Sequence, residues 1–215
     1  MLNYSVQGGS IVVKVHTLVL GPLQTNCYVV WAEGSSSCVV VDPAHSAEQI
    51  LAFATRQGLQ IAGILLTHGH FDHVGAVEDL REATSCGLWM HNGDYQMRRD
   101  PMNDYLYPLH DKDLGEITFC EDGDKISAPG LTFTVLHTPG HSRGSVCYRV
   151  EDVLLSGDTL FAGGCGRTDL PGGDWATILV SLADLSELED SLRVYPGHGE
   201  STTLAREKRY NPYMR

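Results

Sequence analysis

The sequence predicts an α/β protein built from two β-rich layers packed face to face, with helices on the outside. Two observations lead to this fold class. Strand-like apolar runs and segments of helical spacing alternate along the 215 residues, and their order is similar in the two halves. Hydrophobic residues make up 42% of the chain, which is enough for a sizeable core. We therefore expect a single domain over residues 1–215, with two pseudo-repeated halves at about 1–115 and 116–215.

The first half begins with three predicted strands, over residues 11–20, 26–31 and 38–42, and Gly34 with three following serines makes the hairpin connection between the last two. A helix comes next, with Gly58 as its stop, because four apolar residues recur at helical spacing: Ala47, Ile50, Leu51 and Ala54. A buried-type strand then covers 61–66. The next helix is marked by Val74, Val77, Leu80 and Ala83, and a short strand over 88–91 follows.

The segment 92–114 contains two prolines, two arginines and three tyrosines, and it predicts a short helix followed by a long loop. Long loops in compact domains often serve as lids or binding loops. In the second half, strands are predicted over 131–136, 145–150, 153–155 and 193–195. Two helices are predicted there, one over 175–185 and a last one from about 201 to 209.

Charge and composition limit the classes of partner and the cellular location that we expect for the protein. The formal net charge of −12 argues against a nucleic-acid or anionic-membrane surface, which normally carries a basic excess. No segment approaches the ~20 apolar residues of a membrane helix. The polar start, Met1 to Ser10, predicts no signal peptide, so we expect a cytoplasmic protein. The six cysteines form no Cys-x-x-Cys pair, and we interpret them as buried reduced thiols.

The strongest signal is a cluster of ligand-type side chains after the strand at 61–66. Three histidines and an aspartate lie within six residues: His68, His70, Asp72 and His73. Imidazole nitrogens and carboxylate oxygens are good ligands for zinc, iron and manganese. His68 and His70 point to one side of an extended segment because they lie two residues apart. Asp72 and His73 follow where the chain bends into a helix, so the cluster can supply two neighbouring metal positions.

Three later segments each place one more ligand-type residue at the end of a predicted strand. They are Thr138-Pro139-Gly140-His141, Ser156-Gly157-Asp158-Thr159 and Pro196-Gly197-His198-Gly199. In each segment a glycine or proline turn lets the backbone come close and direct one ligand inward. Each segment alone is a weak signal. Together with the first cluster they supply seven ligands, which is enough for two metal ions that share one carboxylate.

These motifs resemble the metallo-β-lactamase superfamily and, within it, the type II glyoxalases (hydroxyacylglutathione hydrolases) and their short bacterial relatives. The similarity runs over nearly the whole chain. Besides the ligand motifs, it includes Gln24-Thr25-Asn26-Cys27-Tyr28, Val41-Asp42-Pro43, Gly140-His141-Ser142-Arg143-Gly144-Ser145, Gly157-Asp158-Thr159-Leu160-Phe161 and the run from Gly166 to Asp174. The motifs are highly specific for the fold and the metal site, and less specific for the substrate.

The resemblance implies a four-layered αβ/βα sandwich of two mixed β-sheets flanked by helices, with the site at one edge of the sheets. It implies a first metal held by His68, His70 and His141, a second held by Asp72, His73 and His198, and Asp158 bridging both. We expect two divalent ions, zinc in the first place, with iron or manganese as alternatives. Asp42 is expected to orient a ligand histidine. Five histidines match no ligand position and are interpreted as structural or exposed: His16, His45, His91, His110 and His137.

For the activity, the resemblance implies a hydrolase of thioesters of the S-acylglutathione type, such as S-lactoylglutathione. Metal binding lowers the pKa of water from 15.7 to about 7, so a hydroxide that bridges the metals would attack the thioester carbonyl. The metals would then stabilise the oxyanion. Asp158 holds both ions in this scheme, and Asp72 helps to orient the hydroxide. Cys165 has no adjacent base in the sequence, and we expect it to pack rather than to react.

Substrate recognition is predicted from Arg167. In type II glyoxalases a basic residue after a Cys-Gly pair contacts a glutathione carboxylate, and Cys165-Gly166 precedes this arginine. The chain departs from the long type II glyoxalases in two ways that bear on glutathione affinity. Glu200 stands where they have a tyrosine, and no separate C-terminal glutathione-binding domain is expected. We expect a small-molecule thioester as the partner, and a monomer or homodimer.

A persulfide dioxygenase of the same fold is the main alternative. That family shares the Gly-Cys-Gly-Arg-Thr-Asp run found here at 164–169, and it uses one iron held by two histidines and one carboxylate. His68, His141 and Asp158 would serve this role, although the following run, 170–174, resembles the hydrolase branch more closely. A lactonase or β-lactamase fits less well with a bridging aspartate together with Arg167. A nuclease would be expected to carry a basic surface, and a non-catalytic binding module to lack a ligand.

Overall fold

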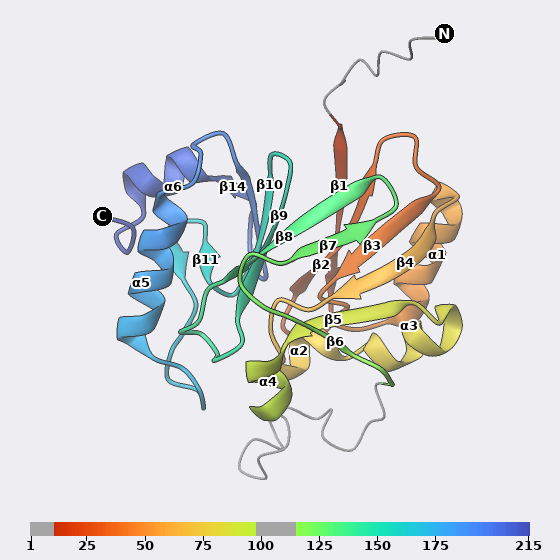
Figure 1. Cartoon of the computed structure of the whole chain (residues 1–215), viewed down its shortest axis with the longest axis horizontal. Helices are drawn as coiled ribbons and strands as arrows, with labels where there is room; N and C mark the ends of the chain where they lie inside the picture. Colours follow the sequence, from red (N-terminus) through yellow and green to blue (C-terminus); the bar gives the residue numbers. More distant parts are fainter. Residues whose placement is uncertain (1–10, 98–114) are drawn as a thin grey trace, which may run out of the picture.

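A computed structural model describes residues 11–97 and 115–215 of the chain. Its strands form two six-stranded sheets, packed face to face, with helices on the outer face of each (Figure 1). The fold class predicted from the sequence is therefore confirmed. Two segments lie outside the described residues: the start, 1–10, and most of the predicted loop, 98–114, with His110. The expectations that there is no signal peptide and that the loop serves as a lid or binding loop therefore stay predictions.

The first sheet has the order β1-β2-β3-β4-β5-β6, antiparallel from β1 to β3 and parallel from β3 to β6. Its strands are β1 (Val13–Leu20), β2 (Thr25–Ala32), β3 (Ser37–Val41), β4 (Gln60–Leu65), β5 (Gly87–His91) and β6 (Thr118–Cys120). The helices of this part are α1 (Ala47–Gln57), α2 (Phe71–Val74), α3 (Val77–Thr84) and α4 (Asn92–Met97). α1 ends at Gly58, which adopts the left-handed conformation with φ 68°, as the sequence predicts.

The second sheet has the order β14-β13-β10-β9-β8-β7 and is also mixed, because only β10 and β13 run parallel. Its strands are β7 (Lys125–Ala128), β8 (Leu131–His137), β9 (Val146–Val150), β10 (Val153–Gly157), β13 (Arg193–Pro196) and β14 (Thr202–Thr203). A small hairpin joins β11 (Leu160–Phe161) to β12 (Gly164–Cys165). The helices are α5 (Trp175–Ser186) and α6 (Leu204–Tyr210), and α5 begins at Asp174, whose carboxylate accepts a hydrogen bond from Thr177 N at 2.7 Å.

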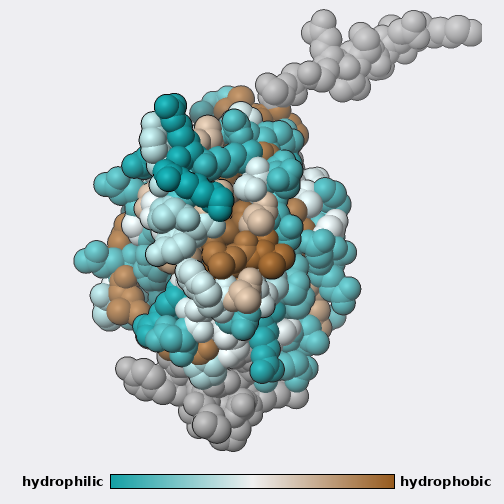
Figure 2. Space-filling model, turned by 90° about the vertical axis from the view of Figure 1, so that its left-hand side faces the viewer, coloured by the Kyte–Doolittle hydropathy of each residue, from teal (hydrophilic) through white to brown (hydrophobic). Residues whose placement is uncertain are grey.

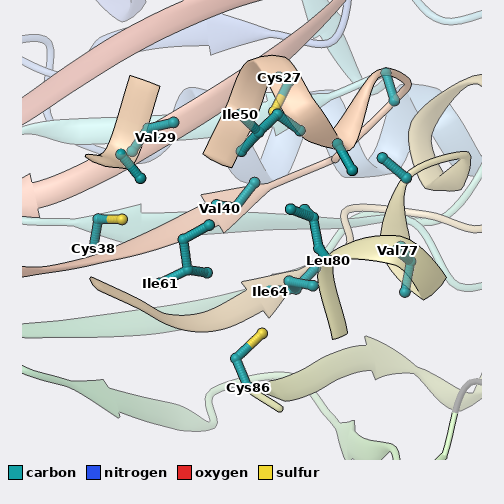
Figure 3. Close-up of a cluster of buried hydrophobic side chains, with 14 of the residues drawn as sticks. Cys27, Val29, Cys38, Val40, Ile50, Ile61, Ile64, Val77, Leu80 and Cys86 are labelled. Carbon is teal, nitrogen blue, oxygen red and sulfur yellow. The ribbon is translucent and has the colours of Figure 1, made fainter. Parts of the chain in front are cut away.

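Three hydrophobic cores separate the four layers, and the alternation of side chains along a strand explains how. In β2, Tyr28 and Val30 enter the core between the two sheets, whereas Cys27 and Val29 enter the core under the helices. Figure 3 shows the core between the first sheet and its helices, where Ile50 of α1 and Leu80 of α3 lie over the sheet. The third core lies between the second sheet and α5. Strands buried on both faces read as continuous apolar runs, and this made them visible in the sequence.

Two predicted helices differ from the structure. The helix expected around Val74 and Val77 is broken into α2 and α3, because Ala76 N donates to Pro43 O at 2.9 Å instead of continuing the helix. At the break, a Cβ on Gly75 would lie 2.4 Å from Ala44 O, so the chain passes too close for any other residue. The last helix begins three residues later than expected because Thr203 caps it and Thr202–Thr203 pairs with β13.

The surface on the side of α5 and α6 is mostly hydrophilic, with one compact hydrophobic patch near its centre (Figure 2). Trp175 and Val180 are exposed hydrophobic residues of α5. Within 11–97 and 115–215, no helix has the length and apolar character needed to span a bilayer. All six cysteines fall in the described ranges and are free thiols, and only Cys165 is not buried.

Candidate metal centre

The ligand-type residues of the first cluster lie between β4 and α2, at the edge of the first sheet. His70 precedes α2 in an extended conformation (φ −64°, ψ 148°), and Asp72 and His73 belong to the helix. The chain therefore changes from extended to helical within the motif, as the sequence predicts. His68, His70 and His73 are all buried, although imidazoles are polar, so their nitrogen atoms require partners inside the protein.

The structure gathers the predicted ligands into two groups. The imidazoles of His68, His70 and His141 form the first group, with ligand atoms within 4.8 Å of one another. His70 Nδ1 lies 2.8 Å from His141 Nε2, although the two residues are 71 positions apart in the chain. The second group holds Asp72, His73 and His198, and Asp72 Oδ2 lies 3.2 Å from His198 Nε2.

Asp158 lies between the two groups. Its Oδ2 is 3.6 Å from His141 Nε2 of the first group and also 3.6 Å from His198 Nε2 of the second. Its Oδ1 is 3.4 Å from His73 Nε2. One carboxylate thus faces both groups, which is the geometry that a bridging ligand requires.

Asp42 stands behind this cluster and fixes it. Its Oδ1 accepts a hydrogen bond from Thr67 N at 2.8 Å, and its Oδ2 accepts from Thr67 Oγ1 at 2.6 Å and from His73 Nδ1 at 2.9 Å. Because both oxygens are occupied in this way, Asp42 acts as an anchor rather than as a ligand of a third site, even though it lies close to His68 and His73. The bond to His73 Nδ1 turns the Nε2 of that ring towards the centre.

The first group is oriented in the same manner. His68 Nδ1 lies 3.0 Å from Thr67 Oγ1, and His141 Nδ1 donates to the backbone carbonyl of Arg167 at 2.8 Å. Since the Nδ1 atoms of His68 and His141 are engaged, the Nε2 lone pairs of these two rings are directed inward. His70 instead turns its Nδ1 towards His141. Within the described parts of the chain, three inward-facing buried atoms have no hydrogen-bond partner: His68 Nε2, His73 Nε2 and Asp158 Oδ1. Divalent cations would satisfy these atoms, so the residues fit a two-metal site.

The electrostatics of the two groups differ. Burial lowers the pKa of His68 far below its usual value, and burial together with the neighbouring His141 lowers the pKa of His70 to about 2. Both rings are therefore neutral at physiological pH, which is the form that binds metals. Burial also lowers the pKa of His73, but Asp158 and Asp42 outweigh it and raise the pKa to about 9. Burial opposes ionisation of Asp72, yet the hydrogen bond from His198 keeps its pKa low. The carboxylates thus place negative charge where a second cation would compensate it.

Long-range hydrogen bonds join the two halves of the chain at the site. Asn26 Nδ2 donates to Pro196 O and to Gly199 O, both at 2.9 Å, and so holds the turn that carries His198. Tyr28 Oη donates to Pro196 O as well. Thr25 Oγ1 donates to Asp72 Oδ2 at 3.0 Å. The Gln24–Tyr28 motif therefore belongs to the scaffold of the metal centre.

Arg167 lies beside the first group, where its backbone carbonyl contacts His141, and Cys165 precedes it by two residues. The Arg167 guanidinium is 61% exposed and pairs with Asp169, at 2.6 Å between Nη2 and Oδ2. It is accessible to a ligand, but a substrate carboxylate would have to compete with Asp169 for it. Cys165 packs against the third core, and burial raises the pKa of its thiol. These observations support the expected packing role of Cys165 because a thiol with a raised pKa is a poor nucleophile at neutral pH.

Four of the histidines that match no ligand position lie in the described residues, and none of the four belongs to either group. His16 stacks on Phe53 at 3.9 Å between ring centroids, and His91 stacks on His137 at 4.2 Å. His45 Nδ1 lies 2.6 Å from Ser46 Oγ.

Asp94 is a site residue that the sequence analysis missed. This buried carboxylate of α4 accepts hydrogen bonds from Gly69 N and Ser142 Oγ, both at 2.7 Å, and from Gly144 N at 2.5 Å. It therefore ties the His68–His73 loop to the loop that carries His141. The pKa of Asp94 is raised, because burial outweighs the hydrogen bonds from Ser142, Gly69 and Gly144 that lower it. The only local signal was an acidic residue at the start of a short helix, which is common without any function.

Glu207 of α6 was also missed, and it supports the β11–β12 hairpin. Its buried carboxylate accepts from Gly163 N and from Thr202 Oγ1, both at 2.7 Å. The neighbouring Asn211 donates to Gly164 O at 2.9 Å. The C-terminal helix thereby holds the β11–β12 hairpin, which leads directly into Gly166 and Arg167.

We predict that Asp94→Asn destabilises the fold. An asparagine amide has only one acceptor oxygen, so in either orientation its NH₂ group faces a backbone N–H. Leaving a buried donor unsatisfied costs about 1–3 kcal/mol, which for a chain of this size lowers Tm by about 3–10 °C. Thermal unfolding of the metal-free protein checks this, with Gln96→Ala on the exposed side of the same helix as the control. An unchanged Tm in Asp94→Asn would show that the tie between the loops carries no stability.

Comparison with known proteins shows which family and which solved structures the chain resembles. The profile of the metallo-beta-lactamase superfamily matches residues 20–198. The hydroxyacylglutathione hydrolase GloC of Haemophilus influenzae is 31% identical over 208 residues, which cover 94% of this chain and 98% of that protein.

Two solved structures share the fold closely. A di-iron-bound form of TTHA1623 is 39% identical with a TM-score of 0.81, and the match covers 93% of this chain and all (100%) of that one. The B3 metallo-beta-lactamase BLEG-1 is 36% identical with a TM-score of 0.82, and the match covers 94% and 99% of the two chains. GloC is a hydroxyacylglutathione hydrolase and BLEG-1 a metallo-beta-lactamase, so similarity alone does not single out a substrate.

Proposed function

The chain belongs to the metallo-β-lactamase superfamily, whose members are hydrolases or related enzymes, and we propose that it hydrolyses thioesters of the S-acylglutathione type at a two-metal site. The observation that carries the proposal is the position of Asp158, which faces both ligand groups at 3.4–3.6 Å. The hydrolase GloC, similar over nearly the full length of both chains, supports the substrate class. We further propose a cytoplasmic monomer or homodimer that acts on a small molecule rather than on nucleic acid or membranes.

We propose that His68, His70 and His141 hold one cation, that Asp72, His73 and His198 hold the other, and that Asp158 contacts both. The bound ions would supply a nucleophilic water at neutral pH and polarise the thioester carbonyl. Zinc suits this mixed imidazole and carboxylate set, and iron or manganese are alternatives, since a relative with 39% identity binds two irons.

The protein's own groups position the reactants. Asp72 and Asp158 are the most exposed carboxylates of the centre, with side chains 13% and 11% accessible, so they face the space where substrate arrives. Asp72 stays ionised at neutral pH because the hydrogen bond from His198 outweighs the effect of burial. It can therefore accept a hydrogen bond from the attacking water and orient its lone pair. A thiolate leaving group is stable enough that no strong general acid is required.

Arg167→Ala is predicted to raise KM for glutathione thioesters about five- to tenfold and to leave kcat nearly unchanged, because a charge-assisted contact to a remote carboxylate binds ground state and transition state equally. Arg167→Lys should recover only part of the loss, since an ammonium cannot make the paired contact. Steady-state kinetics on S-lactoylglutathione check this, with Arg206→Ala on the exposed face of α6 as the control. A KM equal to that of the unchanged protein would remove Arg167 from the binding site.

One paired experiment tests the proposed function against its rivals. Bound zinc, iron and manganese are measured first. Hydrolysis of S-lactoylglutathione is then compared with oxygen uptake on glutathione persulfide and with hydrolysis of a β-lactam. We expect thioester hydrolysis, no oxygen uptake, and a kcat/KM for the β-lactam at least tenfold lower. Oxygen uptake without hydrolysis would establish the persulfide dioxygenase instead, and faster β-lactam turnover would place the chain with BLEG-1.

A further inference from the structure

An apolar cleft opens beside the second ligand group. Its volume is about 270 Å³, and it lies between the turn that joins β1 to β2 and the start of α2. Leu20 lines it from the end of β1, Pro22 and Leu23 from the turn, and Phe71 from α2. The polar side chains of its lining are Thr25, His45 and Asp72. Leu23 is 52% exposed, although leucine gains free energy from burial, so an apolar ligand in the cleft would cover a surface that is now in water.

The cleft is continuous with the metal centre. Thr25 Oγ1 donates to Asp72 Oδ2 at 3.0 Å, and the same oxygen lies 3.2 Å from His198 Nε2. A group bound in the cleft therefore touches a residue of the second ligand group. The turn itself is closed by a hydrogen bond from Gln24 N to Gly21 O at 3.2 Å, and Gly21 enters it with a left-handed φ of 70°.

Chemistry decides which half of a thioester the cleft takes. The glutathione half carries two carboxylates and an ammonium group, and an apolar cleft with one carboxylate, Asp72, on its wall suits neither its charge nor its size. The guanidinium that suits a carboxylate belongs to Arg167, a residue beside the first ligand group. The backbone carbonyl of Arg167 accepts a hydrogen bond from His141 Nδ1 at 2.8 Å. An acyl chain has no charge and gains about 0.8 kcal/mol for each buried methylene.

We infer that this cleft is the acyl subsite and that it selects unbranched apolar acyl groups of about four to six carbons over the lactoyl group. The inference rests on the proposed thioester hydrolysis. The size follows from the volume, because a methylene is about as large as a water molecule, whose share of the liquid is about 30 Å³, and part of the cleft stays open to solvent. The lactoyl group is short and carries a polar hydroxyl next to its carbonyl, so it leaves most of this apolar surface uncovered.

The test uses the metal-loaded full chain and a series of glutathione thioesters with acetyl, butyryl and hexanoyl groups, compared with S-lactoylglutathione. Full burial of a methylene raises kcat/KM about fourfold, so we expect a rise of two- to fourfold per methylene up to hexanoyl. Leu23→Asn should flatten this dependence. Val19→Asn is the matched control, because Val19 is 60% exposed on the same hairpin but does not line the cleft, and it should keep the full slope.

Binding of acetate, butyrate and hexanoate, measured by calorimetry, gives a second readout that does not depend on turnover. Tighter binding of the longer alkanoates, weakened in Leu23→Asn but not in Val19→Asn, is the expected result. Hydrolysis of all thioesters at one rate, together with alkanoate binding that is independent of length, would overturn the acyl subsite and leave the thioesterase intact. Failure to hydrolyse any thioester would overturn the proposed function itself, and the acyl assignment with it.

Discussion

Asp158→Ala should abolish hydrolysis and reduce the metal content from two ions per chain to one or fewer. The carboxylate contacts both ligand groups, at 3.6 Å from His141 Nε2 and 3.4 Å from His73 Nε2, so no other side chain replaces it. Loss of a single preorganised stabilising group commonly costs 10²–10³ in kcat, and loss of a shared metal ligand removes more, so we expect a decrease of about a thousandfold or more. Metal analysis and steady-state kinetics on the same preparation measure both effects.

Asp184→Ala is the control for this substitution, because Asp184 is an exposed aspartate on α5, away from the centre. It should keep full metal content and activity. Two bound metals in a folded Asp158→Ala protein would mean that the two groups bind cations independently. The bridging role would then be wrong.

Gly197→Ala should disrupt the same centre by adding a single methyl group. A Cβ at this position would lie 2.1 Å from Asp158 Oδ1 and 2.7 Å from His73 Cε1, so either the turn or the carboxylate must move. A displacement of about 1 Å at a reacting centre can cost 10²-fold in rate, and we expect a loss of at least that size. Weaker binding of the second metal, measured by competition with a chelator, should accompany it.

Gly164→Ala provides a matched comparison, because a Cβ there meets no atom within 4 Å and the residue does not have a positive φ. It should retain metal affinity and activity. If Gly197→Ala were equally active, the close approach of its backbone to Asp158 would have no role in shaping the site.

The metal-ligand cluster and the layered fold were predictable because their signals are local. The run from His68 to His73 reads as a ligand motif within a few residues, and strands such as Val146–Val150 read as buried apolar runs. Each of His141, Asp158 and His198 follows a predicted strand, and their gathering around that cluster at one edge of the sheets was what the family resemblance implied. Short strands such as Thr118–Cys120 carry no comparable pattern, and they were missed.

Apart from Asp42, the supports of the site could not be predicted because they depend on contacts between distant residues. Asp94 binds groups that lie 25, 48 and 50 positions away in the chain, and no local pattern marks such a carboxylate. Asn26 reaches across 170 residues to Pro196 O. The break between α2 and α3 has a similar origin, since it depends on the approach of Pro43 and Ala44 to Gly75 and Ala76.

A crystal structure of the metal-loaded protein, with anomalous scattering at the edge of the bound metal, tests the central claim most directly. We predict two peaks, one contacted by His68, His70 and His141, the other by Asp72, His73 and His198, with Asp158 touching both. A single peak, or ions bound away from these side chains, would contradict the two-metal site and the hydrolytic mechanism that depends on it.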